Sequence, residues 1–290
     1  MQIRVLGSAA GGGVPQWNCN CFNCRQARRS RSFLTQSSAA VSTDGKNWLL
    51  LNASPDLVFQ FASFASLTPL NHKLRGSAVQ AVVLTDGEMD HVAGLLSLRE
   101  QKSLRLVCTS AVKHLLTRQF PLLPALAKYC RIRHSTFPIR IAGFRLSALE
   151  LETGKAPPYS CRKAQRGEVA GLRLEAGGKC LVYLPGLPAI NQAVNEFVAD
   201  CDCLLVDGTF WAEREMISLG LSKRTAHQMG HVPIDGKGGS LEWLRLLKVP
   251  RKIYTHINNS NPILKKNSRE RRRVENAGVE ISRDGMDICL

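Results

Sequence analysis

The chain has 290 residues, of which 44% are hydrophobic, and its 39 Lys and Arg outnumber 23 Asp and Glu to give a formal net charge of +16. This hydrophobic content is typical of a globular protein and excludes an intrinsically disordered chain. No apolar run approaches the roughly 20 residues that span a bilayer, and the first residues lack a signal-peptide pattern. We therefore expect a cytoplasmic protein with no membrane span.

The positive charge is densest in two runs, Arg25, Arg28, Arg29 and Arg31, and then Lys265, Lys266, Arg269, Arg271, Arg272 and Arg273. Such runs can bind nucleic acid, an anionic membrane or an acidic substrate, or can form the solvated face of a helix. Because no aromatic residues interleave with them and no nucleic-acid module is recognisable, no nucleic-acid partner is expected.

Apolar runs alternate with helical patterns along the chain. The first half predicts strands at 3–6, 38–42, 48–51, 79–84 and 105–108. Asp44-Gly45 predicts a hairpin turn, and Ser54-Pro55-Asp56 a helix start with Ser54 as N-cap. A helix is predicted at 92–98, and helical segments reach about residue 128.

The second half repeats the alternation, with strands predicted at 141–151, 169–174, 180–184, 203–206 and 253–255, and helices at 189–197 and 268–277. Strands that end in Asp or His and are separated by helices favour an α/β fold, an αββα sandwich of two mixed β-sheets flanked by helices. The length suits one domain or two tightly fused halves. No low-complexity linker is found, and we predict a single domain over residues 1–290.

Residues 82–95 read VVLTDGEMDHVAGL. They resemble the T-H-x-H-x-D-H-x-x-G-L loop of the metallo-β-lactamase superfamily, which supplies ligands to two metal ions. Asp86 and Glu88 stand in place of the two leading histidines, while Asp90 and His91 are kept. The resemblance implies that one metal is retained and that the second is lost or altered.

Four residues at positions that the superfamily uses are the candidate ligands of that metal: Asp90, His91, Asp207 and His256. Two imidazoles and one or two carboxylates form an open site that suits iron, manganese or zinc. Each residue alone has a structural explanation, such as a helix start for His91 or a turn for Asp207. Their combination favours the metal site.

Asp86 and Glu88 could bind a harder cation, hydrogen-bond to ligand histidines or contact substrate. His231 is a candidate acid or base, because histidine titrates near neutrality, with a structural histidine as the alternative. We predict catalytic roles for His231 and Asp86, and place Glu88 and Ser38 in the substrate pocket. The missing histidines argue against a hydrolase that needs two metals.

Cys19, Cys21 and Cys24 lie within six residues, where their thiolates could wrap a structural zinc that needs a fourth ligand. They resemble the zinc site of a phosphodiesterase branch of the superfamily, whose fourth ligand is a histidine three residues after the last active-site histidine. Asn259 occupies that position here, so the resemblance implies a zinc loop at 19–24 completed by Asn259. A reactive thiol cluster is the alternative. Other cysteines are expected to be small buried residues, namely Cys108, Cys130, Cys161, Cys180 and Cys289.

Segments such as GSAAGGGVPQWNCNCFNC, LTDGEMDHVAGLLSLRE and MGHVPIDGKGGS follow one another in the order of one family and cover nearly the whole chain. They resemble the coenzyme PQQ synthesis protein B family, which also has Asp in place of the first histidine. Glu88 departs from it, since a neutral glutamine is more usual there. The resemblance implies a role in making pyrroloquinoline quinone (PQQ) from a precursor peptide. Two roles have been assigned: hydroxylation of the tyrosine ring of a crosslinked Glu-Tyr intermediate, and transport of PQQ or its precursor.

The residues favour the hydroxylase, because a mononuclear Fe(II) centre leaves open positions for dioxygen and substrate. Mn, Mg or Zn would also fit. The expected partner is a small-molecule or dipeptide PQQ precursor rich in carboxylates, which positive charge could recruit. A soluble carrier is the main alternative, and a metal-dependent hydrolase is a third. The sequence leaves open whether the chain forms a homodimer.

Overall fold

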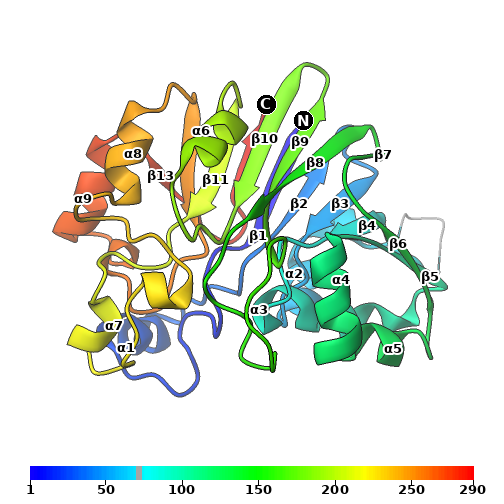
Figure 1. Ribbon diagram of the computed structural model, residues 1–290, viewed down its shortest axis with the longest axis horizontal. Helices are drawn as coiled ribbons and strands as arrows, with labels where there is room; N and C mark the ends of the chain where they lie inside the picture. Colours follow the sequence, from blue (N-terminus) through cyan, green and yellow to red (C-terminus); the bar gives the residue numbers. More distant parts are fainter. Residues whose placement is uncertain (70–73) are drawn as a thin grey trace.

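Two β-sheets pack against each other in the computed structural model, which describes residues 1–69 and 74–290 (Figure 1). The first sheet contains, in spatial order, β14 (Asp287–Cys289), β1 (Gln2–Gly7), β2 (Ser38–Ser42), β3 (Trp48–Leu51), β4 (Val79–Val83), β5 (Ser103–Val107) and β6 (Arg131–Ser135). The second contains β13 (Glu280–Ile281), β12 (Arg251–Thr255), β11 (Cys203–Asp207), β10 (Lys179–Leu184), β9 (Val169–Ala176), β8 (Phe144–Leu151) and β7 (Ile139–Ile141).

Both sheets mix antiparallel and parallel pairs. β1, β2 and β3 pair antiparallel, whereas β3 to β6 run parallel. In the second sheet, β8, β9 and β10 pair antiparallel, and β10, β11 and β12 run parallel. Strands inside a parallel segment are covered on both faces, which explains why every residue of β11 is buried. The C-terminal ends of β11 and β12 consequently meet at one edge of the sheet.

Helices cover the outer face of each sheet (Figure 1). On the first sheet these are α2 (Leu57–Ser63), α3 (Met89–Val92), η2 (Ala93–Glu100), α4 (Ser110–His114), η3 (Leu115–Gln119) and α5 (Leu122–Leu126). On the second they are α6 (Gln192–Val198), α8 (Ser240–Leu246) and α9 (Arg269–Asn276). The remaining helical segments are α1 (Phe22–Ser30), η1 (Ala65–Leu67), α7 (Glu215–Ser218), η4 (His227–Met229) and η5 (Pro262–Leu264).

The hydrophobic core has three layers. Between the sheets, side chains such as Val83 from β4 and Leu205 from β11 pack together. Outside the first sheet, Leu106 packs with helical residues such as Val112, and outside the second sheet Val206 packs in the same cluster as Val194. The αββα sandwich of two mixed sheets predicted from the sequence is therefore confirmed, because each sheet face buries an apolar layer.

Local patterns predicted several elements closely. β2 and β3 have the predicted bounds and pair antiparallel around the predicted turn. The helix predicted at 268–277 is α9, and the hydroxyl of Ser268 caps it by accepting a hydrogen bond from the Arg271 N–H at 3.0 Å. The strands predicted around 79–84, 180–184, 203–206 and 253–255 are β4, β10, β11 and β12.

Other predicted elements differ from the structure for identifiable reasons. The helix predicted to start at Ser54 begins at Leu57, because the Ser54 hydroxyl accepts the Asp56 N–H at 3.2 Å within a turn. The strand predicted at 141–151 is divided into β7 and β8 by Ala142 and Gly143, both with positive φ, at 49° and 81°. The helix predicted at 92–98 is mostly the 3₁₀ segment η2, preceded by the short α3.

Burial of the scattered cysteines was predicted correctly for Cys108, Cys130 and Cys180 and wrongly for Cys161 and Cys289, which are exposed. Cys289 belongs to an edge strand in which only Ile288 faces the core. Cys161 lies in the segment between β8 and β9, which contributes no strand. Chain position therefore outweighed residue type at both sites.

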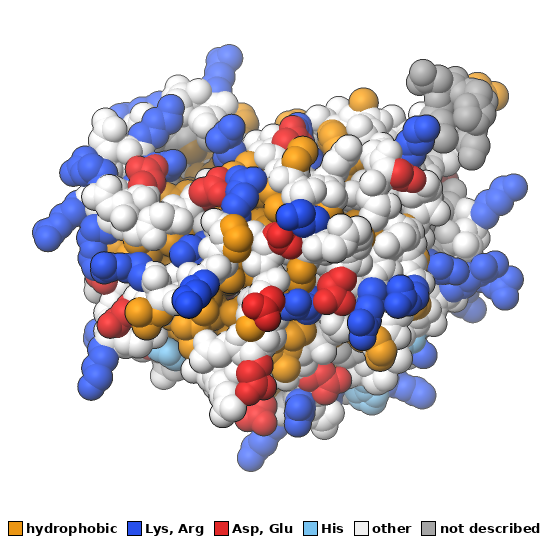
Figure 2. All heavy atoms as spheres, turned by 90° about the horizontal axis from the view of Figure 1, so that it is seen from above, with side chains coloured by type: hydrophobic (Ala, Val, Ile, Leu, Met, Phe, Trp, Pro, Cys, Tyr) orange, Lys and Arg blue, Asp and Glu red, His pale blue; other side chains and the backbone are white. Residues whose placement is uncertain are grey.

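Lys and Arg side chains are spread across the face seen in Figure 2, from the side of α8 and α9 to the side of β5 and β6, with Asp and Glu between them. On this face the positive charge forms no single stripe. Among the helices of residues 1–69 and 74–290, none has both the length and the apolar character needed to cross a membrane.

Candidate metal centre

A cavity of about 270 Å³ lies at the edge of the sandwich where the loops after β4, β11 and β12 meet. The loop after β4 contributes Asp86 to its wall, the short helix α3 contributes Asp90 and His91, and the loop after β12 contributes His256. His231 enters from the segment before α8. These side chains are far apart in the sequence and meet because strands from both sheets end at this edge.

Asp90, His91 and His256 offer ligand atoms that all lie within 4.8 Å of one another. The Asp90 Oδ2 atom lies 3.2 Å from His256 Nε2 and 3.9 Å from His91 Nε2. His91 Nε2 is buried and has no hydrogen-bond partner among the described residues. Since a buried polar atom without a partner is unfavourable, a bound metal ion would satisfy it, and this donor set fits one.

The electrostatics of His91 also fit a bound cation. Burial alone would lower the pKa of His91, but the carboxylates of Asp86 and Asp90 raise it to about 9. Burial likewise opposes ionisation of Asp90, but the charges of His91 and His256 and the hydrogen bond to His256 together outweigh burial and hold the Asp90 pKa below its usual range. The cluster therefore favours positive charge, which either an imidazolium or a metal ion can supply.

Asp86 explains the orientation of His91. Its Oδ2 atom lies 2.7 Å from His91 Nδ1 and also accepts the Thr85 hydroxyl at 2.7 Å. Asn52 Oδ1 accepts the Thr85 N–H at 3.0 Å and fixes that residue in turn. Of the roles considered for Asp86, the geometry matches a hydrogen bond to a ligand histidine, because it leaves His91 Nε2 directed at the cluster.

Asp207, His231 and His256 form a second group within the same 4.8 Å limit. Asp207 Oδ2 lies 2.7 Å from His231 Nδ1 and accepts the Leu187 N–H at 2.8 Å. His231 was predicted as an acid or base, and the structure also brings it within ligand distance of the cluster. His256 joins the two groups, and its φ of 56° is rare for a residue other than glycine.

Thr209 organises this second group and was missed by sequence reasoning. Its hydroxyl donates to Asp207 Oδ1 at 2.6 Å and lies 2.8 Å from His256 Nδ1. A hydroxyl that donates to the carboxylate can accept the His256 Nδ1–H, which leaves His256 Nε2 free to bind a metal. The signal in the sequence was the position of Thr209 directly after the Asp207-Gly208 turn.

The structure also brings together the four residues predicted to bind zinc. The sulfur atoms of Cys19, Cys21 and Cys24 lie within 4.8 Å of one another. Asn259 Nδ2 lies 3.0 Å from Cys19, 3.3 Å from Cys24 and 3.6 Å from Cys21. Burial would raise the pKa of Cys19, but hydrogen bonds, chiefly from the Cys21 backbone, lower it. Turning the amide by half a rotation would present its oxygen to a cation instead.

The two residues predicted for the substrate pocket lie in different places. Glu88 lines the cavity, where its carboxylate pairs with Lys155 Nζ at 2.9 Å. Ser38 is buried on β2, and its hydroxyl donates to the carbonyl groups of Leu51 and Asn52. In the described structure, Ser38 is therefore used by the sheet and does not face the cavity.

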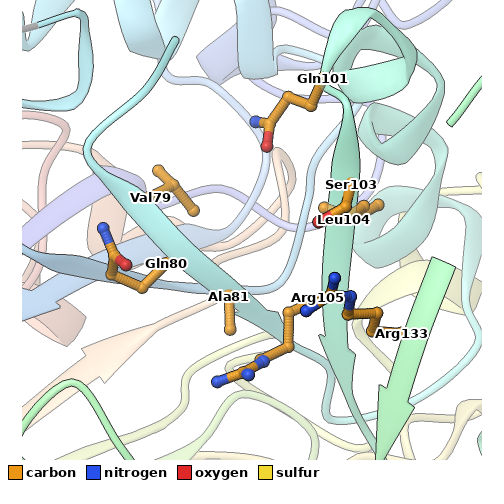
Figure 3. A pocket seen from close by; sticks show the side chains of 8 residues that line it. All are labelled: Val79, Gln80, Ala81, Gln101, Ser103, Leu104, Arg105 and Arg133. Carbon is orange, nitrogen blue, oxygen red and sulfur yellow. The ribbon is translucent and has the colours of Figure 1, made fainter. Parts of the chain in front are cut away.

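A second hollow of about 220 Å³ lies along β4 and β5, where Arg105 and Arg133 approach each other (Figure 3). No His, Cys, Asp or Glu lines it in the part of the chain that the structure describes. Since it offers no metal-binding side chain, this hollow is not a candidate metal site.

The chain is similar to known proteins in both sequence and fold. Residues 47–257 match the model of the beta-lactamase superfamily domain. Over the whole of both chains, the sequence is 43% identical to coenzyme PQQ synthesis protein B of Methylococcus capsulatus and 42% identical to that of Pseudomonas aeruginosa. The Zn²⁺-bound PqqB of Methylobacterium extorquens superposes over the whole of both chains with a TM-score of 0.91 and 37% identity. A diphosphatase of the PhnP family shares the fold, with a TM-score of 0.73 at 20% identity over all of this chain and 97% of its own.

Proposed function

This chain belongs to the coenzyme PQQ synthesis protein B family of the β-lactamase superfamily, and on that premise we propose that it acts in PQQ biosynthesis as a metal-dependent hydroxylase. Its substrate would be a crosslinked Glu-Tyr intermediate, hydroxylated on the tyrosine ring. The observation that carries the proposal is the buried, unpartnered Nε2 of His91 beside Asp90 and His256.

Asp90, His91 and His256 would hold the metal, and Asp207 could complete its protein ligands. Iron(II), when bound, supplies the redox chemistry needed to activate dioxygen, which zinc cannot. The relative from Methylobacterium extorquens contains Zn²⁺, and Zn, Mn and Mg remain alternatives at this site. Cys19, Cys21, Cys24 and Asn259 would hold the separate structural zinc.

The residues of the chain have distinct tasks in this proposal. Asp86 holds His91 at Nδ1, and Thr209 holds His256 at Nδ1, so both rings keep their orientation. Asp207 holds His231 at Nδ1, which leaves its Nε2 to take up or release a proton at the substrate. Phe210 meets the His231 ring edge-on at 5.7 Å and offers an apolar wall to an aromatic substrate.

The same geometry weighs against hydrolysis. The carboxylate of Asp86, which replaces the first histidine of the superfamily loop, already contacts His91 Nδ1 and accepts the Thr85 hydroxyl.

Hydroxylation has a requirement of its own. Inserting one oxygen atom of dioxygen into a ring C–H bond requires two electrons and two protons, so an external reductant must be supplied with the substrate. A carrier would need neither dioxygen nor a reductant.

The test is anaerobic reconstitution of the protein with Fe(II), followed by oxygen, ascorbate and a crosslinked Glu-Tyr dipeptide, with product mass as the readout. The expected result is a gain of one oxygen atom that is lost in Asp90→Ala and His256→Ala. Tight binding of the dipeptide without a change in mass would overturn the hydroxylase in favour of a carrier. Failure to bind Fe(II) would overturn the proposed active site.

A further inference from the structure

We infer that Lys155 and Arg224 form a carboxylate-binding subsite at the mouth of the metal cavity, and that Glu88 occupies Lys155 until an anionic substrate displaces it. Both cations and Glu88 line the same cavity as His91. The inference rests on the proposed function in one respect only, namely that the substrate enters this cavity. It assigns residues of this chain to the carboxylates of that substrate.

Lys155 is placed by contacts that its own segment makes with the metal loop. The Tyr159 hydroxyl donates to the Gly87 carbonyl at 2.5 Å and ties the segment between β8 and β9 to the loop after β4. A Cβ atom at Gly230 would lie 3.7 Å from Lys155 Cδ, so the lysine side chain passes beside the residue that precedes His231. Its ammonium group ends 2.9 Å from Glu88 Oε1.

The ion pair between Lys155 and Glu88 is open to exchange. The two side chains remain 25% and 28% exposed, and an ion pair in contact with water contributes little to stability. An incoming carboxylate with the same geometry can therefore replace Glu88 on Lys155 without loss of a buried contact. Glu88 would then act as an internal substitute for the substrate's anionic group.

Arg224 supplies the second positive charge. It is exposed, lines the cavity from the segment before η4, and forms no ion pair with any residue in the described ranges. The two cations at the mouth contrast with the carboxylates of Asp86, Asp90 and Asp207 near the metal cluster. An aromatic polycarboxylate is thereby oriented, because its carboxylates are attracted outward while its ring can reach Phe210.

The experiment is calorimetric titration of the zinc-loaded protein with isophthalate, an aromatic dicarboxylate, and with isophthalamide, its neutral counterpart. Lys155→Gln and Arg224→Gln should each weaken isophthalate binding by about tenfold, which corresponds to about 1.4 kcal/mol. Glu88→Gln should strengthen binding, since it frees Lys155. Lys163→Gln, an exposed lysine in the same segment that does not line the cavity, should leave binding unchanged.

Equal binding by Lys155→Gln and the unchanged protein would overturn the inference, as would equal affinity for the neutral isophthalamide. Weaker binding in Glu88→Gln would overturn the displacement step. The titration needs neither dioxygen nor a reductant. Isophthalate binding as described, together with no gain of oxygen in the Fe(II) assay with the Glu-Tyr dipeptide, would therefore refute the proposed function alone. Hydroxylation of the dipeptide that tolerates Lys155→Gln and Arg224→Gln would refute the subsite alone.

Discussion

Asp86 Oδ2 lies 2.7 Å from Nδ1 of His91. The residue that replaces the first histidine of the superfamily loop is thus bound to the histidine that the loop retains. A histidine in this position would have directed a second ligand nitrogen toward a metal, whereas the carboxylate orients an existing ligand. We therefore propose that the substitution changes the function of the position from metal binding to support of a metal ligand.

Asp86→Asn should weaken metal binding by about 10- to 100-fold, the usual cost of altering a partner of a ligand histidine. An amide is a weaker acceptor than a carboxylate for the His91 Nδ1–H and removes negative charge beside the imidazole. The measurement is competition with a chelator for Fe(II) or Zn²⁺. Asp287→Asn, on the exposed edge strand β14, is the matched control. Unchanged metal affinity in Asp86→Asn would contradict the orienting role.

Thr209→Val should reduce both metal affinity and turnover, whereas Thr209→Ser should restore both. Valine keeps the branched shape but removes the hydroxyl that contacts Asp207 and His256, leaving buried polar groups without a partner. The loss of metal affinity is expected to be about tenfold. Chelator competition and steady-state rates provide the readouts. If serine fails to rescue the protein, side-chain packing and not the hydroxyl is what matters.

In protein loaded with zinc at both sites, Cys24→Ser should lower the zinc content from two ions per chain to one while the cavity keeps its metal. A hydroxyl is a poor zinc ligand in comparison with a thiolate, and the three sulfur atoms lie within 4.8 Å of one another. Metal analysis after dialysis, combined with a thermal melt, measures this. Cys289→Ser serves as control, since Cys289 is exposed on an edge strand. Retention of both ions would indicate that the cysteine cluster holds no zinc.

Asp202→Asn should destabilise the protein at neutral pH by about 0.5–1 kcal/mol, an ordinary value for a partly exposed ion pair. The Lys179 ammonium at 2.9 Å lowers the pKa of Asp202 below its ordinary 3.8. This stabilisation is therefore fully present above about pH 4 and is lost as the pH falls through the lower folded-state pKa.

Urea unfolding of both proteins between pH 7 and pH 3 measures the effect, and the two free energies of unfolding should converge at the acidic end. Asp200→Asn is the control, because Asp200 is exposed in the same turn and asparagine tolerates its φ of 57°. A difference that persists unchanged to pH 3 would show that the carboxylate charge is not responsible.

Much of the fold followed from local patterns. β2, β3 and α9 were predictable because alternation, the Asp44-Gly45 turn and the Ser268 cap depend on neighbouring residues only. β6 was not predicted. Its RIRHS sequence has little apolar character, and it forms a strand because β5 offers a parallel edge for pairing.

The sequence by itself determined which residues could bind metal. Asp90, His91, Asp207 and His256 each follow a strand-like run, and this shared position indicates a common site. The three cysteines Cys19, Cys21 and Cys24 lie within six residues, and that spacing alone indicates a common ligand. Only the tertiary structure decided how these groups work together. It placed Thr209 against His256, 47 residues away, and Lys155 against Glu88. It also directed the Ser38 hydroxyl to a backbone carbonyl of the sheet and away from the cavity. Such contacts depend on which strand ends meet at one edge, and spacing along the chain carries no information about that meeting.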